Sequence, residues 1–183
     1  MAKINFSNIE TIYSKYIDKL YSYALHLGFD ESTAMDAIHD VFYKLCINHS
    51  SLNKISNLKF YLFKALRNRL VDLHRTNREY LGLSSMLEKN SEEFSFHLNV
   101  SIEDELIEKE DWEEICKKVE NVLNRLTDRQ REIIYLRYIQ EQSYEEISEI
   151  MHITVESSRN LISKSLSIIK GSSLSYVLLL LTI

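Results

Sequence analysis

The chain has 183 residues, 45% of them hydrophobic, and a formal net charge of −5. It contains three glycines and no proline, and long stretches with a period of 3.6 residues favour an all-α fold of one or two compact cores. The negative charge argues against a protein that coats nucleic acid nonspecifically, so any contact with nucleic acid would depend on local basic patches. Cys46 and Cys116 are far apart and show no metal-ligand spacing, which argues against a metal site or disulfide framework and fits a reduced, cytoplasmic setting.

Neither end of the chain has the pattern of a signal peptide or a membrane span. Met1–Ser7 lacks an apolar core. The apolar stretch Tyr176–Ile183 is far shorter than the roughly 20 residues that a spanning helix needs. We expect the tail, residues 172–183, to pack on the last helix or on a partner, and any membrane contact to be indirect.

Residues 1–78 are predicted to form a domain of three helices. The first helix begins near Ile9 and is ended by Gly28, as glycine often follows a helix. The second starts at about Ser32, and the third runs from about Asn57 to Arg78. The second helix has an apolar stripe at Ala34, Ala37, Ile38, Val41, Phe42 and Leu45.

The second helix also has a polar strip beside its apolar stripe. Helical spacing places four residues on it, beside a buried Val41 and Phe42: Asp36, His39, Asp40 and Tyr43. Such a strip suits a basic partner helix. Taken alone, the strip is best interpreted as an ordinary solvated surface.

The third helix is strongly basic. Lys59–Arg78 holds six Lys/Arg and one acid, a net charge of +5 in a negative chain. Its spacing predicts an inward stripe at Leu58, Tyr61, Leu62, Ala65, Leu66, Arg69 and Leu73, and an opposite face at Phe60, Phe63, Lys64, Arg67, Asn68, Val71 and Arg75. Cations mixed with aromatic rings suit single-stranded nucleic acid. The alternative is that Phe60 and Phe63 fill the core while the cations are merely solvated.

Residues 79–110 are predicted to be an acidic linker, because they lack a sustained apolar period. Residues 88–114 hold eleven acids against two lysines, a net charge of −9. We expect this linker to be flexible up to about Val100, with helix resuming near Ile102. A solvated acidic spacer is the simplest interpretation.

Residues 111–171 are predicted to form a second helical domain that ends in a helix-turn-helix. Its apolar stripe restarts at Trp112, and capping boxes begin at Thr127 and Ser143. His152 lies in the turn, and Thr154 caps the last helix. The polar face of that helix suits a DNA major groove, although any amphipathic helical hairpin would share the pattern. It comprises Glu156, Ser157, Arg159, Asn160, Ser163, Lys164 and Ser167.

The three motifs, in this order, resemble the extracytoplasmic-function (ECF) group of sigma-70-type RNA polymerase sigma factors. DAIHDVFYKL is similar to region 2.2, which grips the polymerase. NLKFYLFKALRNRLVDLHR is similar to regions 2.3–2.4, which melt and read the −10 element. The segment from LNRLTDRQ to SRNLISKSL is similar to region 4, whose last helix reads the −35 element.

The resemblance implies a role for each matching position. The positions that match the polymerase-binding segment are Asp36, His39, Asp40, Val41 and Phe42. Those that match the −10 helix are Lys64, Arg67, Asn68, Asp72 and Arg75, and those on the −35 helix are Ser157, Arg159, Asn160 and Lys164. The chain departs from the family pattern at three positions: His152 replaces a usual glycine, Ser148 a usual alanine, and Ser158 a usual apolar residue.

The resemblance also implies a non-catalytic function with macromolecular partners. We expect a cytoplasmic sigma factor that binds core RNA polymerase and promoter DNA and is held inactive by an anti-sigma factor, with no cofactor and no small-molecule substrate. The alternatives are a helix-turn-helix regulator that works without polymerase and an interaction module that binds no DNA. The six histidines show no ligand or triad pattern and no glycine-rich phosphate loop is present, which argues against an enzyme.

Overall fold

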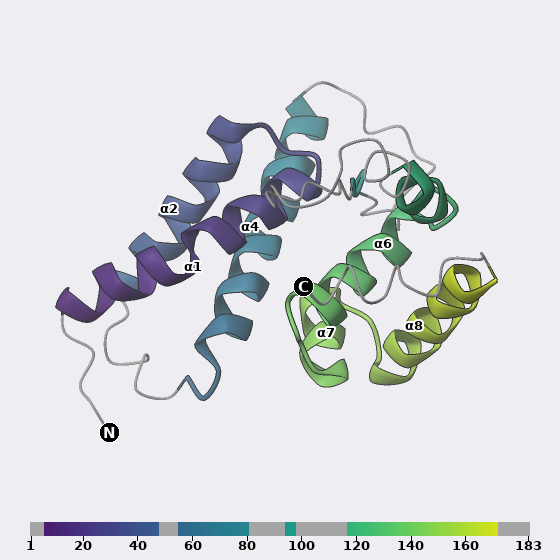
Figure 1. Ribbon diagram of the computed structural model, residues 1–183. Helices are drawn as coiled ribbons and strands as arrows, with labels where there is room; N and C mark the ends of the chain where they lie inside the picture. The colour runs from purple at the N-terminus through teal and green to yellow at the C-terminus, as the bar shows by residue number, and fades with distance from the viewer. Residues whose placement is uncertain (1–5, 48–54, 81–93, 98–116, 172–183) are drawn as a thin grey trace, which may run out of the picture. The chain divides into compact units, whose positions relative to one another are not determined.

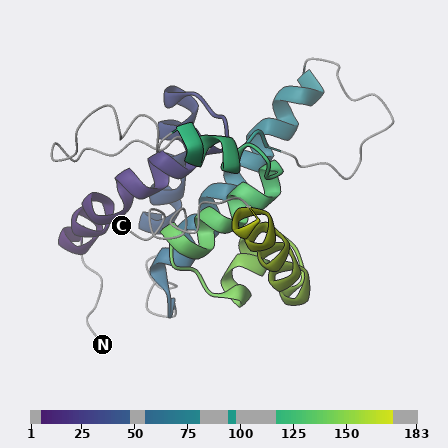
Figure 2. The ribbon, with the colours of Figure 1, turned by 45° about the vertical axis from the view of Figure 1, so that its right-hand side comes forward.

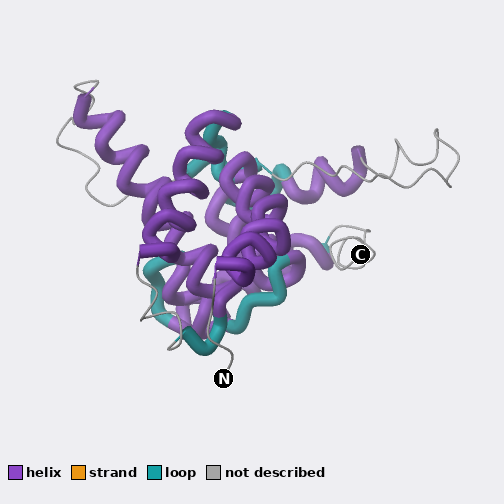
Figure 3. Tube along the Cα trace, turned by 90° about the vertical axis from the view of Figure 1, so that its left-hand side faces the viewer, coloured by secondary structure: helices purple, strands orange, loops and turns teal. Residues whose placement is uncertain are grey.

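The computed structural model describes residues 6–47, 55–80, 94–97 and 117–171, and all of its regular structure in these ranges is helical (Figures 1 and 3). The chain divides into two compact units, Met1–Glu92 and Glu93–Ile183. The expected all-α fold is therefore confirmed. Within the described ranges, no helix combines the length and the apolar character needed to cross a bilayer. The predicted apolar tail and the restart of the helical stripe at Trp112 lie outside the described residues.

The first unit consists of the three predicted helices, α1 (Phe6–His26), α2 (Glu31–Ile47) and α4 (Leu58–Tyr80). Each of them packs against the other two (Figures 1 and 2). Gly28 follows α1 with a φ of 84°, a conformation that glycine adopts without strain, so its predicted role as a helix end is confirmed. Asp30 then accepts hydrogen bonds from the Thr33 amide and hydroxyl, which lower the pKa of its carboxyl and start α2.

The core of the first unit is formed by the predicted stripe of α2, which is buried in full, and by one face of α4. The buried residues of α4 are Leu62, Phe63, Leu66, Arg67 and Leu70. The Phe63 ring packs on Tyr23 of α1 at a centroid distance of 5.2 Å. Of the two interpretations left open for the aromatic residues, the one in which Phe63 fills the core is confirmed. The expected outward position of Arg67 was wrong, because the Phe63 ring fixes the rotation of α4 about its axis.

The second unit contains helical residues 117–123, α6 (Asp128–Ile134), a π-helical turn η1 (Tyr135–Ile139), α7 (Tyr144–Ile150) and α8 (Val155–Lys170). Both predicted capping boxes are present, at Thr127 and at Ser143, and the Thr154 side chain accepts from the Ser157 amide at 3.0 Å. α8 packs on both α6 and α7. The helix-turn-helix is confirmed, while η1 was not predicted.

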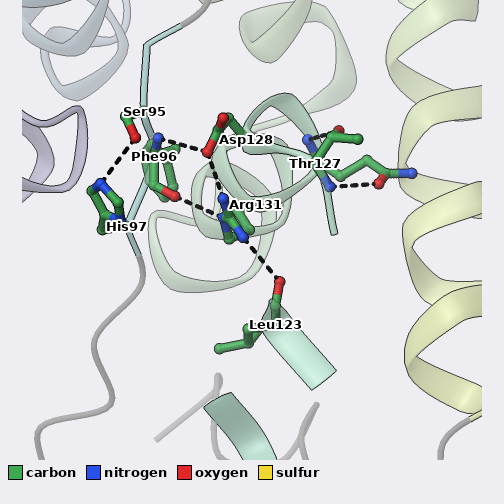
Figure 4. A network of polar contacts seen from close by, with 8 residues as sticks. Ser95, Phe96, His97, Leu123, Thr127, Asp128 and Arg131 are labelled. Atoms are coloured by element: carbon green, nitrogen blue, oxygen red, sulfur yellow. Dashed lines mark hydrogen bonds and ion pairs between the residues drawn. The ribbon is translucent and has the colours of Figure 1, made fainter. Parts of the chain in front are cut away.

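A short extended segment, Phe94–His97, packs on the second unit although it lies within the predicted linker. Phe94 and Phe96 are buried, and the Phe96 ring lies 5.6 Å from the Tyr135 ring. Figure 4 shows the polar contacts: the Phe96 amide donates to Asp128 at 3.0 Å, and Arg131 Nε donates to the Phe96 carbonyl at 2.7 Å. The compact second unit therefore starts before residue 111.

Phe96 is expected to contribute to the stability of the second unit. Replacing it with alanine (Phe96→Ala) removes a buried ring and should lower the free energy of unfolding by about 3 kcal/mol. Urea denaturation followed by circular dichroism measures the change. Ser95→Ala, at the exposed position next to it, is the control, and equal effects of the two variants would contradict the packing role.

Candidate nucleic-acid and partner interfaces

The predicted polar strip of α2 lies on the surface, on top of apolar residues that support it. Asp36, His39 and Tyr43 are exposed, and Asp40 is half-exposed. Val41 and Phe42 are 3% and 5% exposed, so they support the strip from beneath and do not face a partner directly. Two exposed apolar side chains lie on the same side of α2 and make the strip partly hydrophobic: Tyr43, 66% exposed, and Ile47, 62% exposed.

α1 stabilises one edge of this strip through an aromatic contact. The Tyr13 hydroxyl lies 3.2 Å from His39 Nε2, within hydrogen-bond distance. The Tyr13 ring also packs edge-on against Phe42 at a centroid distance of 4.9 Å. These contacts restrict the orientation of His39. The sequence placed Tyr13 on the apolar stripe of the first helix, but its contact with His39 was not predicted, because it joins residues that are far apart in sequence.

The outward face of α4 differs from the predicted face. Its exposed and half-exposed residues recur every three or four positions: Tyr61, Lys64, Ala65, Asn68, Arg69, Asp72, Arg75 and Thr76. Four of the five predicted −10 residues lie on this face, since Lys64, Asn68, Asp72 and Arg75 all reach the surface. The fifth, Arg67, is only 3% exposed and lies in the core. Its predicted role as a residue that contacts the −10 DNA was therefore wrong. Arg69, which was expected to point inward, is on the surface instead.

A small polar cavity of about 200 Å³ lies between α2 and the outward face of α4. Its lining comprises Asp40, Val41, Lys44, Tyr61, Ala65, Asn68, Arg69 and Asp72. Across it, Arg69 Nε donates to Asp40 Oδ2 at 2.8 Å, and Arg69 Nη2 lies 2.7 Å from the same oxygen. The strip of α2 and the face of α4 therefore meet at one ion pair.

The predicted −35 residues of α8 lie together on its exposed face. Ser157, Arg159, Asn160 and Lys164 are all exposed, whereas Ser158, Ile162, Ser165 and Ile169 are buried. Ser158 occupies a position where the family pattern has an apolar residue, but its hydroxyl donates to the Val155 carbonyl at 2.7 Å, so the buried oxygen is satisfied. In the turn, His152 has a φ of 53°, which supports the expectation that histidine can replace glycine there.

Two residues beside α8 were missed by the sequence analysis, Arg137 of η1 and Tyr144 of α7. The guanidinium groups of Arg137 and Arg159 lie 4.8 Å and 5.5 Å from the centroid of the Tyr144 ring. Arg137 Nη1 also donates to the Gln142 carbonyl at 2.8 Å, which fixes its direction. Two cations thus share one ring beside a polar helix face, and Arg159 also pairs with Glu145 at 3.5 Å.

The missed site has only a weak signal in the sequence. Tyr144 directly follows the cap Ser143, at an N-terminal helix position that is often near the surface. The position of Arg137, however, depends on the π-helical turn, which no local pattern indicated. Beside it, burial and the nearby Tyr144 raise the pKa of the Tyr138 phenol.

Comparisons with known proteins agree for both units. The family model "Sigma-70 region 2" matches residues 12–80, and "Sigma-70, region 4" matches residues 116–168. RNA polymerase sigma factor SigZ of Bacillus subtilis is 25% identical over 157 residues, 86% of this chain and 82% of the relative. ECF RNA polymerase sigma factor SigM of the same organism is 26% identical over 150 residues, 80% of this chain and 83% of the relative.

One similar solved structure is the sigma factor RpoE of Bartonella quintana in complex with the anti-sigma factor NepR. The TM-score is 0.58 at 20% identity, and the match covers 90% of this chain and 96% of that one. This likeness supports the fold.

Arg67 is expected to be important for folding rather than for DNA contact. Replacing it with alanine (Arg67→Ala) removes the packing of a buried side chain and should lower the free energy of unfolding by about 2–3 kcal/mol. Arg75→Ala, at a side chain that is 69% exposed, should change it by less than about 0.5 kcal/mol. Thermal unfolding of both variants measures the difference, and an Arg67→Ala protein as stable as wild type would contradict the assignment.

Proposed function

We propose that the two units of this chain have different binding roles. The chain belongs to the ECF group of sigma-70-type RNA polymerase sigma factors. As a sigma factor it binds core RNA polymerase and directs the initiation of transcription at promoter DNA. The observation that carries the division of roles is that three helices each have an exposed polar face: the strip of α2, the outward face of α4 and the polar face of α8. Binding rather than catalysis is the proposed mode of action.

The first unit is proposed to bind polymerase through α2 and the −10 element through α4. Asp36, His39 and Asp40 give the strip charge and hydrogen-bonding groups, and the buried pair beneath them keeps α2 in place. On α4, Arg75 and Lys64 supply positive charge for phosphates. Asn68 offers a donor and an acceptor to an unpaired base, and Asp72 offers an acceptor.

The second unit is proposed to bind the −35 element through α8 in the major groove. Asn160 is proposed to read base edges, Lys164 to contact the backbone, and Ser157 and Arg159 to contact base edges or backbone. Arg137 and Tyr144 extend this surface toward the phosphates. Two linked DNA-binding units act as one bivalent reader, because binding of the first raises the effective concentration of the second.

Regulation by an anti-sigma factor and action in the bacterial cytoplasm are parts of the same proposal. The strip of α2 combines exposed carboxylates with exposed Tyr43 and Ile47. An anti-sigma factor that covered it would compete directly with polymerase. The family membership supports this part of the proposal.

Run-off transcription tests the function. Core RNA polymerase is assayed on a library of AT-rich bacterial promoters with and without the protein. Initiation at defined start sites only in its presence is the expected result. Tight duplex binding by the protein alone, without initiation, would instead identify a regulator that works without polymerase.

Asn160 and Lys164 are expected to contribute differently to −35 recognition. Asn160→Ala should weaken the free energy of binding to the promoter by about 1–3 kcal/mol, because it removes a base contact. It should also relax the sequence preference at one base position. Lys164→Ala should weaken binding more evenly across sequences and, through loss of a phosphate contact, reduce the slope of log affinity against log salt by about 0.9. Affinities of the polymerase holoenzyme for promoter variants at several salt concentrations measure both, and identical profiles for the two variants would contradict the assignment.

Asp36 is expected to be important for polymerase binding. Asp36→Lys reverses a charge on the strip and should weaken binding to core polymerase about tenfold, since the proposed partner surface is basic. Asp18→Lys makes the same change at an exposed position of α1 and is the control. Binding is measured by fluorescence anisotropy with labelled protein, and equal losses would show only a general charge effect.

A further inference from the structure

Arg69 lines the cavity between α2 and α4 and pairs with Asp40 across it, and the proposed function above gives Arg69 no role. It lies on the outward face of α4, between Asn68 and Asp72 in sequence and on the same side as both. Its guanidinium is held by Asp40 of α2 through contacts of 2.8 Å and 2.7 Å. Arg69, on the proposed DNA-binding face, is thus paired with Asp40, on the proposed polymerase-binding strip.

The contact engages the Nε–Nη2 edge of the guanidinium group, an edge through which arginine also binds phosphates. Nε and Nη2 converge on one carboxylate oxygen, Asp40 Oδ2. Carboxylates and phosphates compete for the same planar donors of a guanidinium group. While Asp40 is in place, these donors of Arg69 are engaged and less available to DNA.

The charges that line the cavity balance one another. Lys44 and Arg69 are positive and Asp40 and Asp72 are negative, so the four charges of the lining sum to zero. Asp72 also contacts Arg75, at 3.2 Å. If the charge of Asp40 is removed, the lining of the cavity has a net positive charge on the side of α4 that is proposed to face DNA.

We propose that Asp40 blocks Arg69 in the free protein and that core polymerase, by engaging Asp40, releases Arg69 to bind a phosphate of the promoter −10 strand. This proposal rests on the proposed function. The side chains of Arg69 and Asp40 are 34% and 45% exposed, so the pair is weak and a binding partner can replace it. The free protein then has low affinity for DNA, and the affinity rises on the polymerase.

The test measures binding of the full-length protein, without polymerase, to a short labelled single-stranded oligonucleotide of mixed sequence by fluorescence anisotropy. Asp40→Asn removes the charge that holds Arg69 and should tighten binding about threefold to tenfold, with a steeper dependence on salt. Arg69→Gln alone should leave the affinity of the free protein nearly unchanged, because Arg69 is already occupied. The double variant Asp40→Asn, Arg69→Gln should lose the gain.

Asp36→Asn is the matched control, since it makes the same change of charge one turn earlier on α2, outside the cavity lining. An equal gain from Asp36→Asn and Asp40→Asn would overturn the proposal, because net charge alone would then explain it. A gain that persists in the double variant would also overturn it. Circular dichroism checks folding, and Asp40→Ser replaces Asp40→Asn if that variant does not fold.

The release step is tested on the polymerase. There, Arg69→Gln should reduce open-complex formation, and Asp40→Asn should no longer improve DNA binding; an undiminished gain on the polymerase would overturn the release step. Failure of wild-type protein to initiate in run-off transcription would reject the proposed function itself. The binding measurements on the free protein would still decide whether Asp40 blocks Arg69.

Discussion

The rotation of α4 about its own axis determines both functional surfaces of the first unit. Phe63, Leu66 and Leu70 are each fully buried. Burial of each such side chain stabilises the fold by about 1.5–3 kcal/mol. This is more than the free energy that a solvated charge on the same helix contributes. Once these residues face inward, Arg67 must lie in the core, and Asn68, Arg69 and Asp72 must lie outside. The same rotation brings Arg69 to Asp40.

In the second unit, local hydrogen bonds start the helices and a non-local contact completes the surface proposed to bind DNA. Ser143 and Thr154 cap α7 and α8 independently of the rest of the fold. Tyr144 and Arg159 belong to different helices, and Arg137 comes from the π-helical turn. These three meet only after α7 and α8 have packed. The proposed phosphate site is therefore a property of the tertiary structure.

The Phe94–His97 segment changes where the second unit begins. Its two phenylalanines lie two positions apart, as suits an extended segment that buries one side. Such a pattern has no helical period, so it does not predict a helix. The many acidic residues around it favoured a solvated spacer. The contacts with Asp128 and Arg131 show that part of the predicted linker belongs to the second unit. Less of the chain is then left to join the two DNA-binding units.

By itself, the sequence determined the all-α class, the three helices of the first unit, the stripe of α2, the caps and the exposed face of α8. These features depend on neighbouring residues or on one unambiguous helical period. Only the tertiary structure decided the facing of α4, because its apolar and cationic residues alternate closely enough to allow two stripes. It also decided the burial of Arg67, the Asp40–Arg69 pair and the Tyr144 site. Each of these requires residues from different parts of the chain to meet, and the packing of large side chains selects which ones do.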